Sequence, residues 1–190
     1  MRAVFLDRDG VINELVLNPA TGEYEPPHSP DDMTLFPWVI NSLKVLRESG
    51  FELFMVSNQP DYAKGKVSLE AINAVHTKLD GILSLEGIQI REYYYCYHHP
   101  RGVVPGYSFE CACRKPKPFF ILNAAKKFGI DLSGSWMIGD RDTDIECGKQ
   151  AGVSTILVEE KHSSDYRGST NPDYYAANLK VASQIIFDRE

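Results

Sequence analysis

The sequence lacks a surplus of basic residues, and it also lacks a long apolar run. Its formal net charge of -6 leaves no excess of positive charge for binding a polyanion, so we expect no nucleic-acid partner. No apolar stretch approaches the ~20 residues needed to span a bilayer, and the first residues, MRAVFLD, show no signal-peptide cleavage pattern. We therefore expect a cytoplasmic protein without a membrane partner.

Cysteine is scarce as well, and the chain has no internal repeat or low-complexity tract. Four cysteines, three of them between Cys96 and Cys113, are too few and too unevenly placed for a secreted disulfide framework. The chain does have 190 residues with 43% hydrophobic content, which is enough for one sizeable core. We predict a single domain over residues 1–190 and a monomer.

Short apolar runs alternate with longer segments that carry apolar residues every three or four positions. This pattern is typical of β-α-β units and predicts a Rossmann-like three-layer α/β/α fold with a central, mostly parallel sheet. The predicted strands are Ala3–Leu6, Glu52–Val56, Tyr93–Tyr95, Trp136–Ile138 and Thr155–Val158. The predicted helices run from Val39 to Leu46, Leu69 to Ile82 after the N-cap Ser68, about Pro118 to Phe128, near Asp142 to Gly152, and Tyr175 to Phe187.

Two carboxylates, Asp7 and Asp9, follow the first predicted strand in the sequence D-R-D-G. In open α/β sheets, ligands bind at the carboxyl ends of the strands. One carboxylate there can attack phosphorus to form an aspartyl-phosphate, while the other protonates the leaving oxygen and later activates water. The alternative from this fragment alone is an ordinary acidic turn after a buried strand.

Two further segments offer groups that suit a phosphate ester. Ser57 and Asn58 end another predicted strand and could donate hydrogen bonds to phosphate oxygens, although such residues are more often turn formers or caps. In Arg114-Lys115-Pro116-Lys117, Lys115 would offset the repulsion between a phosphate and Asp7, and Arg114 can hold phosphate in a bidentate manner. A solvated basic turn is the alternative, and it suits Lys117 best.

An acidic cluster follows the predicted strand that ends at Ile138. Magnesium prefers oxygen ligands, which Asp7, Asp140 and the backbone carbonyl of Asp9 could provide. Asp142 and Asp144 stand where a helix begins. We interpret Asp142 as a cap that complements the helix dipole, and for Asp144 the capping and ligand roles are equally open.

In this order, D-R-D-G, S-N, K-P and G-D-x-x-x-D resemble the four motifs of the haloacid dehalogenase superfamily, and they span residues 7 to 144. The resemblance implies a magnesium-dependent phosphatase. By position, it implies that Asp7 is the nucleophile, Asp9 the general acid and base, Ser57 and Lys115 phosphate binders, and Asp140 a magnesium ligand.

Cys96-Tyr97-His98 and Cys111-Ala112-Cys113 form a C-x-H and a C-x-C pair within residues 96–113. Three thiolates and one imidazole are typical of a closed structural zinc site. His99 is the alternative to His98 as the fourth ligand. We favour His98 because the spacing of its C-x-H pair matches that of the C-x-C pair. Since Arg114 and Lys115 follow directly, zinc would fix two phosphate-binding residues as it orders the loop.

This C-x-H, C-x-C, R-K-P-K-P arrangement resembles the heptose 1,7-bisphosphate and histidinol-phosphate phosphatases, a branch without a large cap domain. D-R-D-G-V-I-N, S-N-Q and Y-C-x-H-H-P are closer to the heptose enzymes, whereas G-D-R-x-T-D leans toward the histidinol enzymes. Two segments depart from the heptose pattern: Pro60–Lys66 replaces an Arg-bearing loop, and residues 15–33 are longer and richer in proline.

The resemblance therefore implies a small phosphorylated metabolite as the substrate. D-glycero-D-manno-heptose 1,7-bisphosphate, on the way to lipopolysaccharide, is our expectation, with histidinol phosphate as the alternative substrate. A zinc-stabilised module that binds a phosphorylated ligand without catalysis is the alternative of a different class. Glu14, Tyr24, His28 and Lys64 are candidate substrate contacts by position only.

Overall fold

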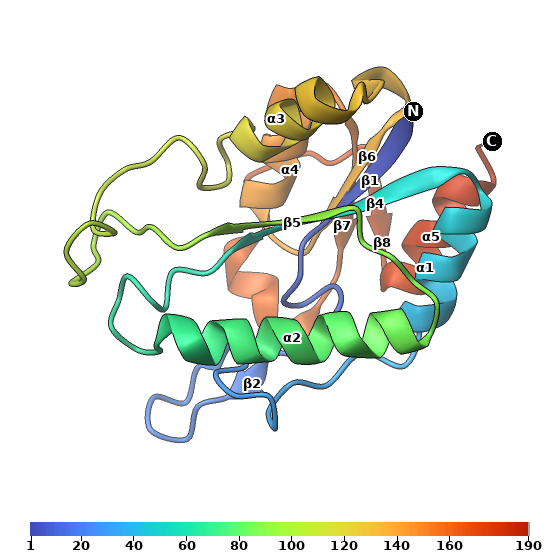
Figure 1. Ribbon diagram of the computed structural model, residues 1–190. Helices are drawn as coiled ribbons and strands as arrows, with labels where there is room; N and C mark the ends of the chain where they lie inside the picture. The colour runs from blue at the N-terminus through green and yellow to red at the C-terminus, as the bar shows by residue number, and fades with distance from the viewer. Residues whose placement is uncertain (190) are drawn as a thin grey trace.

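A six-stranded parallel sheet forms the middle layer of the protein in the computed structural model, which describes residues 1–189 (Figure 1). The strand order is β5-β4-β1-β6-β7-β8, and every neighbouring pair is parallel. The strands are β1 (Arg2–Leu6), β4 (Phe51–Asn58), β5 (Glu92–Cys96), β6 (Trp136–Gly139), β7 (Ser154–Val158) and β8 (Tyr174–Ala176). A separate antiparallel hairpin consists of β2 (Val16–Leu17) and β3 (Tyr24–Glu25).

Helices cover both faces of the sheet, so the predicted three-layer fold is confirmed (Figure 1). One face carries α1 (Val39–Glu48), α2 (Leu69–Leu85) and α5 (Leu179–Phe187), and the other carries α3 (Phe119–Phe128) and α4 (Asp142–Ala151). Successive residues of β1 point to opposite faces, with Val4 and Leu6 in one core and Ala3 and Phe5 in the other. Because both faces of β1 are buried, Ala3–Leu6 is a continuous apolar run rather than an alternating one.

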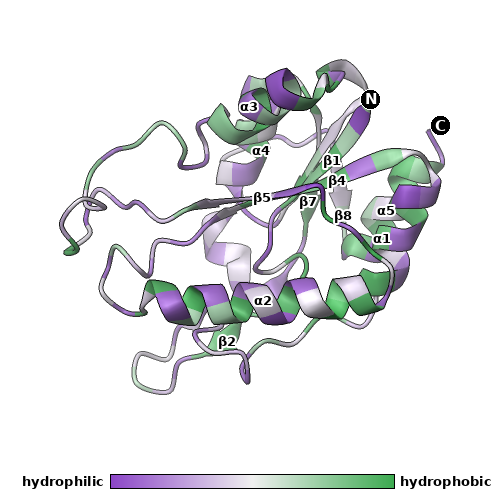
Figure 2. Ribbon diagram, in the orientation of Figure 1, coloured by the Kyte–Doolittle hydropathy of each residue, from purple (hydrophilic) through white to green (hydrophobic). Residues whose placement is uncertain are grey.

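The helix ends follow the expected local chemistry. The Ser68 hydroxyl accepts a hydrogen bond from the Ala71 amide at 3.2 Å and caps α2. Gly129 and Gly152 adopt the left-handed conformation after α3 and α4. Hydrophobic and hydrophilic residues alternate along α2, whose apolar stripe faces the sheet (Figure 2).

The predicted helix Tyr175–Phe187 is wrong at its start. Tyr174–Ala176 forms β8, which pairs with β7 at the edge of the sheet, and the helix begins at Leu179. Its N-cap is Asn178, whose side chain accepts a hydrogen bond from the Val181 amide at 3.1 Å. A three-residue strand is too short to display a two-residue alternation, and its two tyrosines fitted the helical period equally well.

Within residues 1–189, no helix combines the length and the hydrophobicity required to cross a membrane.

Candidate active site

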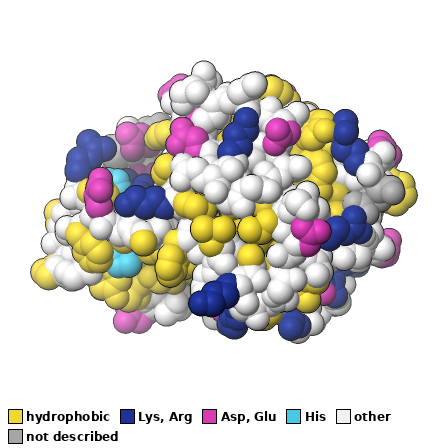
Figure 3. Space-filling view, turned by 90° about the horizontal axis from the view of Figure 1, so that it is seen from above, with side chains coloured by type: hydrophobic (Ala, Val, Ile, Leu, Met, Phe, Trp, Pro, Cys, Tyr) yellow, Lys and Arg dark blue, Asp and Glu magenta, His cyan; other side chains and the backbone are white. Residues whose placement is uncertain are grey.

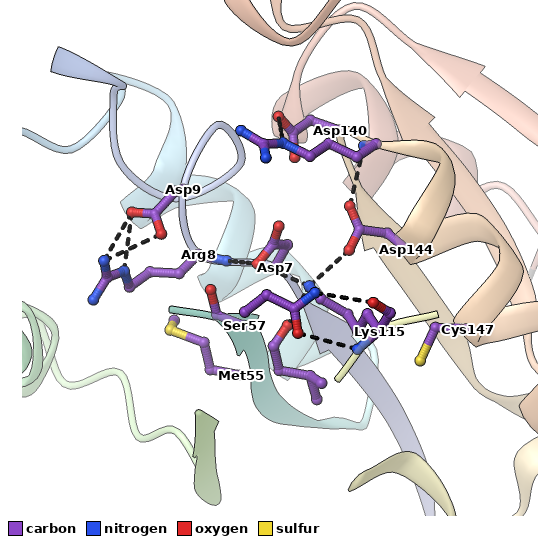
Figure 4. Close-up of polar contacts among 12 residues, drawn as sticks. Asp7, Arg8, Asp9, Met55, Ser57, Lys115, Asp140, Asp144 and Cys147 are labelled. Atoms are coloured by element: carbon purple, nitrogen blue, oxygen red, sulfur yellow. Dashed lines mark hydrogen bonds and ion pairs between the residues drawn. The ribbon is translucent and has the colours of Figure 1, made fainter. Parts of the chain in front are cut away.

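The carboxyl ends of the central strands bring the predicted site residues together at one edge of the sheet (Figure 4). Asp7 follows β1, Ser57 lies near the end of β4, and Asp140 follows β6, while Lys115 comes from the segment before α3. These residues meet at a cavity of about 710 Å³, which Asp7, Ser57 and Lys115 line directly. The strand order therefore unites motifs that are far apart in the sequence.

Lys115 is the buried cation of this cavity. Its ammonium group lies 2.9 Å from Asp7 Oδ1 and 2.6 Å from Asp144 Oδ1, and it donates a hydrogen bond to the Val56 carbonyl at 2.6 Å. Although burial disfavours the charged form, the carboxylates of Asp144 and Asp7 raise the pKa of Lys115 above its usual value. Lys115 is therefore ionised and partly neutralises the acidic cluster.

Asp7, Asp140 and Asp144 offer oxygen atoms that all lie within 4.8 Å of one another. Burial, together with the charges of Asp144 and Asp9, outweighs the pairing with Lys115 and raises the pKa of Asp7 to about 6. Burial and the Asp7 carboxylate also raise the pKa of Asp140. Ser163 donates a hydrogen bond to Asp140 Oδ2, but the buried Asp140 Oδ1 has no partner within residues 1–189. A hard cation bound beside this oxygen would satisfy it.

The two acids at the start of α4 have different roles. Asp144 Oδ2 accepts a hydrogen bond from the Arg141 amide at 3.0 Å, so Asp144 caps the helix while its other oxygen holds Lys115. Asp142 is not the predicted cap, because the N-cap is Arg141, but it lies in the first turn of α4, where its charge complements the helix dipole as expected. Its carboxylate also holds the loop before β8, accepting from the Ser169 amide at 2.8 Å and the Thr170 hydroxyl at 2.5 Å.

Asp9 lies beside Arg8, on the side away from Asp7 and Lys115 (Figure 4). Arg8 holds the Asp9 carboxylate in a bidentate pair at 3.0 and 3.1 Å, and Gln59 and Asn13 add hydrogen bonds at 2.6 and 3.0 Å. Sequence reasoning missed these three partners. Only Arg8 could have indicated these contacts from the sequence, because a charged residue between two acids in a buried segment needs an ionic partner.

Asn58 lines the cavity and also positions Lys115. The Lys115 amide donates to Asn58 Oδ1 at 3.0 Å, and Asn58 Nδ2 donates to the Lys115 carbonyl at 3.1 Å. This reciprocal pair fixes the backbone from which the Lys115 side chain extends. One proton of the Asn58 amide is used in this pair, and the predicted hydrogen bond to phosphate would need the other.

The predicted zinc residues converge at the end of β5 and in the loop that precedes α3. The three sulfur atoms of Cys96, Cys111 and Cys113 lie 3.4 to 3.5 Å apart, and His98 Nδ1 lies 3.8 Å from Cys96 Sγ and 3.6 Å from Cys113 Sγ. Zinc bonds of ~2.3 Å give tetrahedron edges of about 3.8 Å, close to these separations. His99 is not part of the cluster, since its Nδ1 accepts a hydrogen bond from the Arg101 amide at 3.1 Å.

A second group of cations lines the same cavity beyond Lys115. It includes Lys64, Arg101 and Arg114, and the His99 imidazole lines the cavity with them. Burial and the positive charges of Arg114, Lys64 and Arg101 lower the pKa of His99, so these groups are close enough to repel one another. Lys and Arg side chains lie beside His side chains at this end of the molecule (Figure 3). A bound anion would relieve this repulsion.

The segment 15–33, which contains the β2–β3 hairpin and whose role the sequence left open, makes three contacts around the cavity. Glu25 pairs with Lys66, and His28 Nε2 lies 2.9 Å from Asp61 Oδ2. On the other side, Tyr24 stacks on His162 of η2 (Lys161–Tyr166), with ring centroids 3.4 Å apart. Tyr24 and Glu25 also line the cavity, so the segment 15–33 forms part of its wall.

Comparison with known sequences places the chain among phosphatases of sugar bisphosphates. The HAD-hydrolase-like family model matches residues 112–182. A D-glycero-alpha-D-manno-heptose-1,7-bisphosphate 7-phosphatase from Photorhabdus laumondii is 35% identical over 98% of this chain and 97% of its own length. A D-glycero-beta-D-manno-heptose-1,7-bisphosphate 7-phosphatase from Yersinia pestis is 32% identical over 93% of this chain and 90% of its own length. The similarity therefore extends over nearly the whole of each protein.

Solved structures agree with this placement. D,D-heptose 1,7-bisphosphate phosphatase from B. bronchiseptica, crystallised with magnesium and phosphate, matches with a TM-score of 0.82 and 25% identity over 100% of both chains. The corresponding enzyme from Burkholderia thailandensis matches with a TM-score of 0.68 over 98% of this chain and 99% of its own. At 20% identity, the second likeness shows the fold alone.

Proposed function

Because the chain belongs to the heptose-1,7-bisphosphate 7-phosphatase family of haloacid dehalogenase-like hydrolases, we propose that it removes the 7-phosphate from a D-glycero-D-manno-heptose 1,7-bisphosphate. The proposal is carried by one observation: a buried Asp7–Lys115 pair, 2.9 Å apart, shares its cavity with a second group of cations. A substrate with two phosphates matches two cationic regions. The 7-phosphate would meet Asp7, Ser57 and Lys115, and the 1-phosphate would meet Lys64, Arg101 and Arg114.

The reaction proceeds in two displacements at phosphorus. In the first, an Asp7 carboxylate oxygen attacks phosphorus, the ester bond breaks, and Asp9 gives a proton to the leaving sugar oxygen. In the second, Asp9 takes a proton from water as the water oxygen attacks the aspartyl-phosphate, which releases inorganic phosphate and regenerates Asp7. Asp9 also lines the cavity, so the leaving oxygen would lie beside its carboxyl group. Lys115 reduces the repulsion between Asp7 and the incoming phosphate throughout.

Asp7, Asp140 and the backbone carbonyl of Asp9 would hold a magnesium ion in this cavity. The unsatisfied Asp140 Oδ1 and the raised pKa of Asp7 fit such a site, because both describe buried carboxyl groups short of positive charge. When bound, magnesium neutralises charge on the phosphate oxygens. The B. bronchiseptica relative was crystallised with magnesium and phosphate together, which supports this proposal.

Cys96, His98, Cys111 and Cys113 would hold a structural zinc ion, and about one equivalent of zinc per purified chain is expected. Stripping the zinc should lower the melting temperature and the activity together, because the loop carries Arg114 and Lys115. Elemental analysis and thermal unfolding measure both effects. The Cys147→Ser variant is the control and should retain its zinc, since this cysteine lies outside the cluster. A metal-free protein with unchanged hydrogen-exchange protection in the loop would refute the site.

The substrate is tested by comparing kcat/KM for both anomers of heptose 1,7-bisphosphate, for heptose 7-phosphate and for histidinol phosphate. We expect kcat/KM to be about 10- to 100-fold higher for the bisphosphates than for heptose 7-phosphate. This ratio corresponds to the free energy of one or two charge-assisted hydrogen bonds to the second phosphate. The relatives named above act on different anomers, so the panel also identifies the anomer. A large preference for histidinol phosphate would overturn the proposal, and no turnover on any ester with magnesium would favour the non-catalytic module.

A further inference from the structure

Gln59 connects the proposed acid Asp9 to the phosphate binder Ser57. It follows β4, and only 3% of its surface is exposed. Its side-chain amide nitrogen donates to Asp9 Oδ2 at 2.6 Å and to Ser57 Oγ at 3.0 Å, while its oxygen accepts from Arg8 at 2.9 Å. All four side chains are buried, so these contacts are not shared with bulk water.

The chemistry of its neighbours determines the orientation of the Gln59 amide. Arg8 can only donate hydrogen bonds, so it must face the amide oxygen. The amide nitrogen then faces Asp9 and donates to its carboxyl oxygen. The nitrogen carries two protons. One is directed to Asp9, and the other is therefore directed to Ser57.

This orientation determines what the Ser57 hydroxyl can do. Ser57 Oγ accepts a proton from Gln59, and a hydroxyl has only one proton of its own to donate. No residue between 1 and 189 accepts that proton in the structure, and Ser57 lines the cavity beside Asp7. The Ser57 proton is therefore available to a phosphate oxygen in the cavity.

We propose that Gln59 is a positioning residue that presents the Ser57 hydroxyl to the substrate phosphate as a hydrogen-bond donor. The inference rests on the phosphatase reaction but not on the identity of the sugar. If the amide were replaced by an acceptor, Ser57 would donate to it and would no longer serve the phosphate. The same amide nitrogen holds Asp9 in place, so Gln59 joins the groups that act on the phosphate and on the leaving oxygen.

The Gln59→Glu variant tests the proposal, because it preserves shape while replacing the donor with an acceptor. The dissociation constant of inorganic phosphate is measured with the magnesium-loaded enzyme by calorimetry. We expect it to rise about 10- to 100-fold, as expected for the loss of one hydrogen bond to a charged group. The Gln184→Glu variant on the exposed side of α5 is the matched control and should leave phosphate binding unchanged.

A double-mutant cycle with Ser57→Ala separates this role from simple charge repulsion. If Gln59 acts through Ser57, adding Ser57→Ala to Gln59→Glu should weaken phosphate binding by less than twofold beyond Gln59→Glu alone. Additive losses, or unchanged phosphate binding in Gln59→Glu, would overturn the proposal. The uncharged Gln59→Met variant offers only a weak acceptor, so its phosphate binding should weaken less than that of Gln59→Glu. Because inorganic phosphate is the probe, a wrong sugar assignment would not alter these outcomes.

Discussion

Replacing Asp7 with Asn is expected to lower phosphatase turnover by a factor on the order of 10⁴ or more, the usual scale for removing a nucleophile. The amide has the size of the carboxylate but cannot form the aspartyl-phosphate. Its oxygen can still accept a hydrogen bond from Lys115, which lies 2.9 Å from Asp7 Oδ1, so the fold should persist. Phosphate release in the presence of magnesium, with melting temperature recorded in parallel, measures the two effects.

The control for this substitution is Asp131→Asn, which makes the same chemical change at an exposed residue before η1 (Leu132–Gly134). Turnover should not change in this variant, because Asp131 accepts hydrogen bonds only from its own turn. If Asp7→Asn retained wild-type turnover, the nucleophile assignment would be wrong and Asp9 or Asp140 would have to be reconsidered.

Replacing Lys115 with Met should destabilise the protein by about 3–5 kcal/mol, because removing one partner leaves buried charges uncompensated. Lys115 is 2% exposed and contacts both Asp7 and Asp144, and no other lysine in the described part of the chain does so. Activity should fall as well, since nothing then reduces the repulsion between Asp7 and phosphate. Urea unfolding at pH 7 measures the change in stability.

Lys117→Met provides the comparison for that experiment. Lys117 is two residues away and exposed, and its ammonium group donates only to the Cys111 carbonyl at 2.8 Å. Its loss should cost less than ~1 kcal/mol. Equal destabilisation by the two substitutions would show that Lys115 does not serve as the counter-charge of the acidic cluster.

Most of the fold was predictable because its strands are buried on both faces. Such strands appear as short apolar runs, and helices that cover a sheet carry an apolar stripe, so both patterns are local. The β2–β3 hairpin was not predicted, and the short edge strand β8 could not be separated from the helix after it. Pairing with β7 decides that Tyr174–Ala176 is a strand, and this pairing is a tertiary contact.

The site could be predicted in part for a related reason. Asp7, Ser57 and Asp140 each lie at or near the carboxyl end of a strand, and parallel strands end at a common edge. The direction of a side chain is not a local property. Asn58 pairs with the backbone of Lys115 because β4 and the loop before α3 lie side by side, which no spacing in the sequence reveals.

The D-R-D-G sequence shows most clearly what is encoded locally and what depends on tertiary contacts. By itself it determined that two carboxylates follow a buried strand, because strand burial and turn chemistry are encoded within a few residues. The carboxyl end of such a strand is where α/β sheets bind ligands. Only the tertiary structure decided their partners. Asp7 faces Lys115, whereas Asp9 is held by Arg8 and Gln59, because the partners of a buried charge come from whichever segments the fold packs against it.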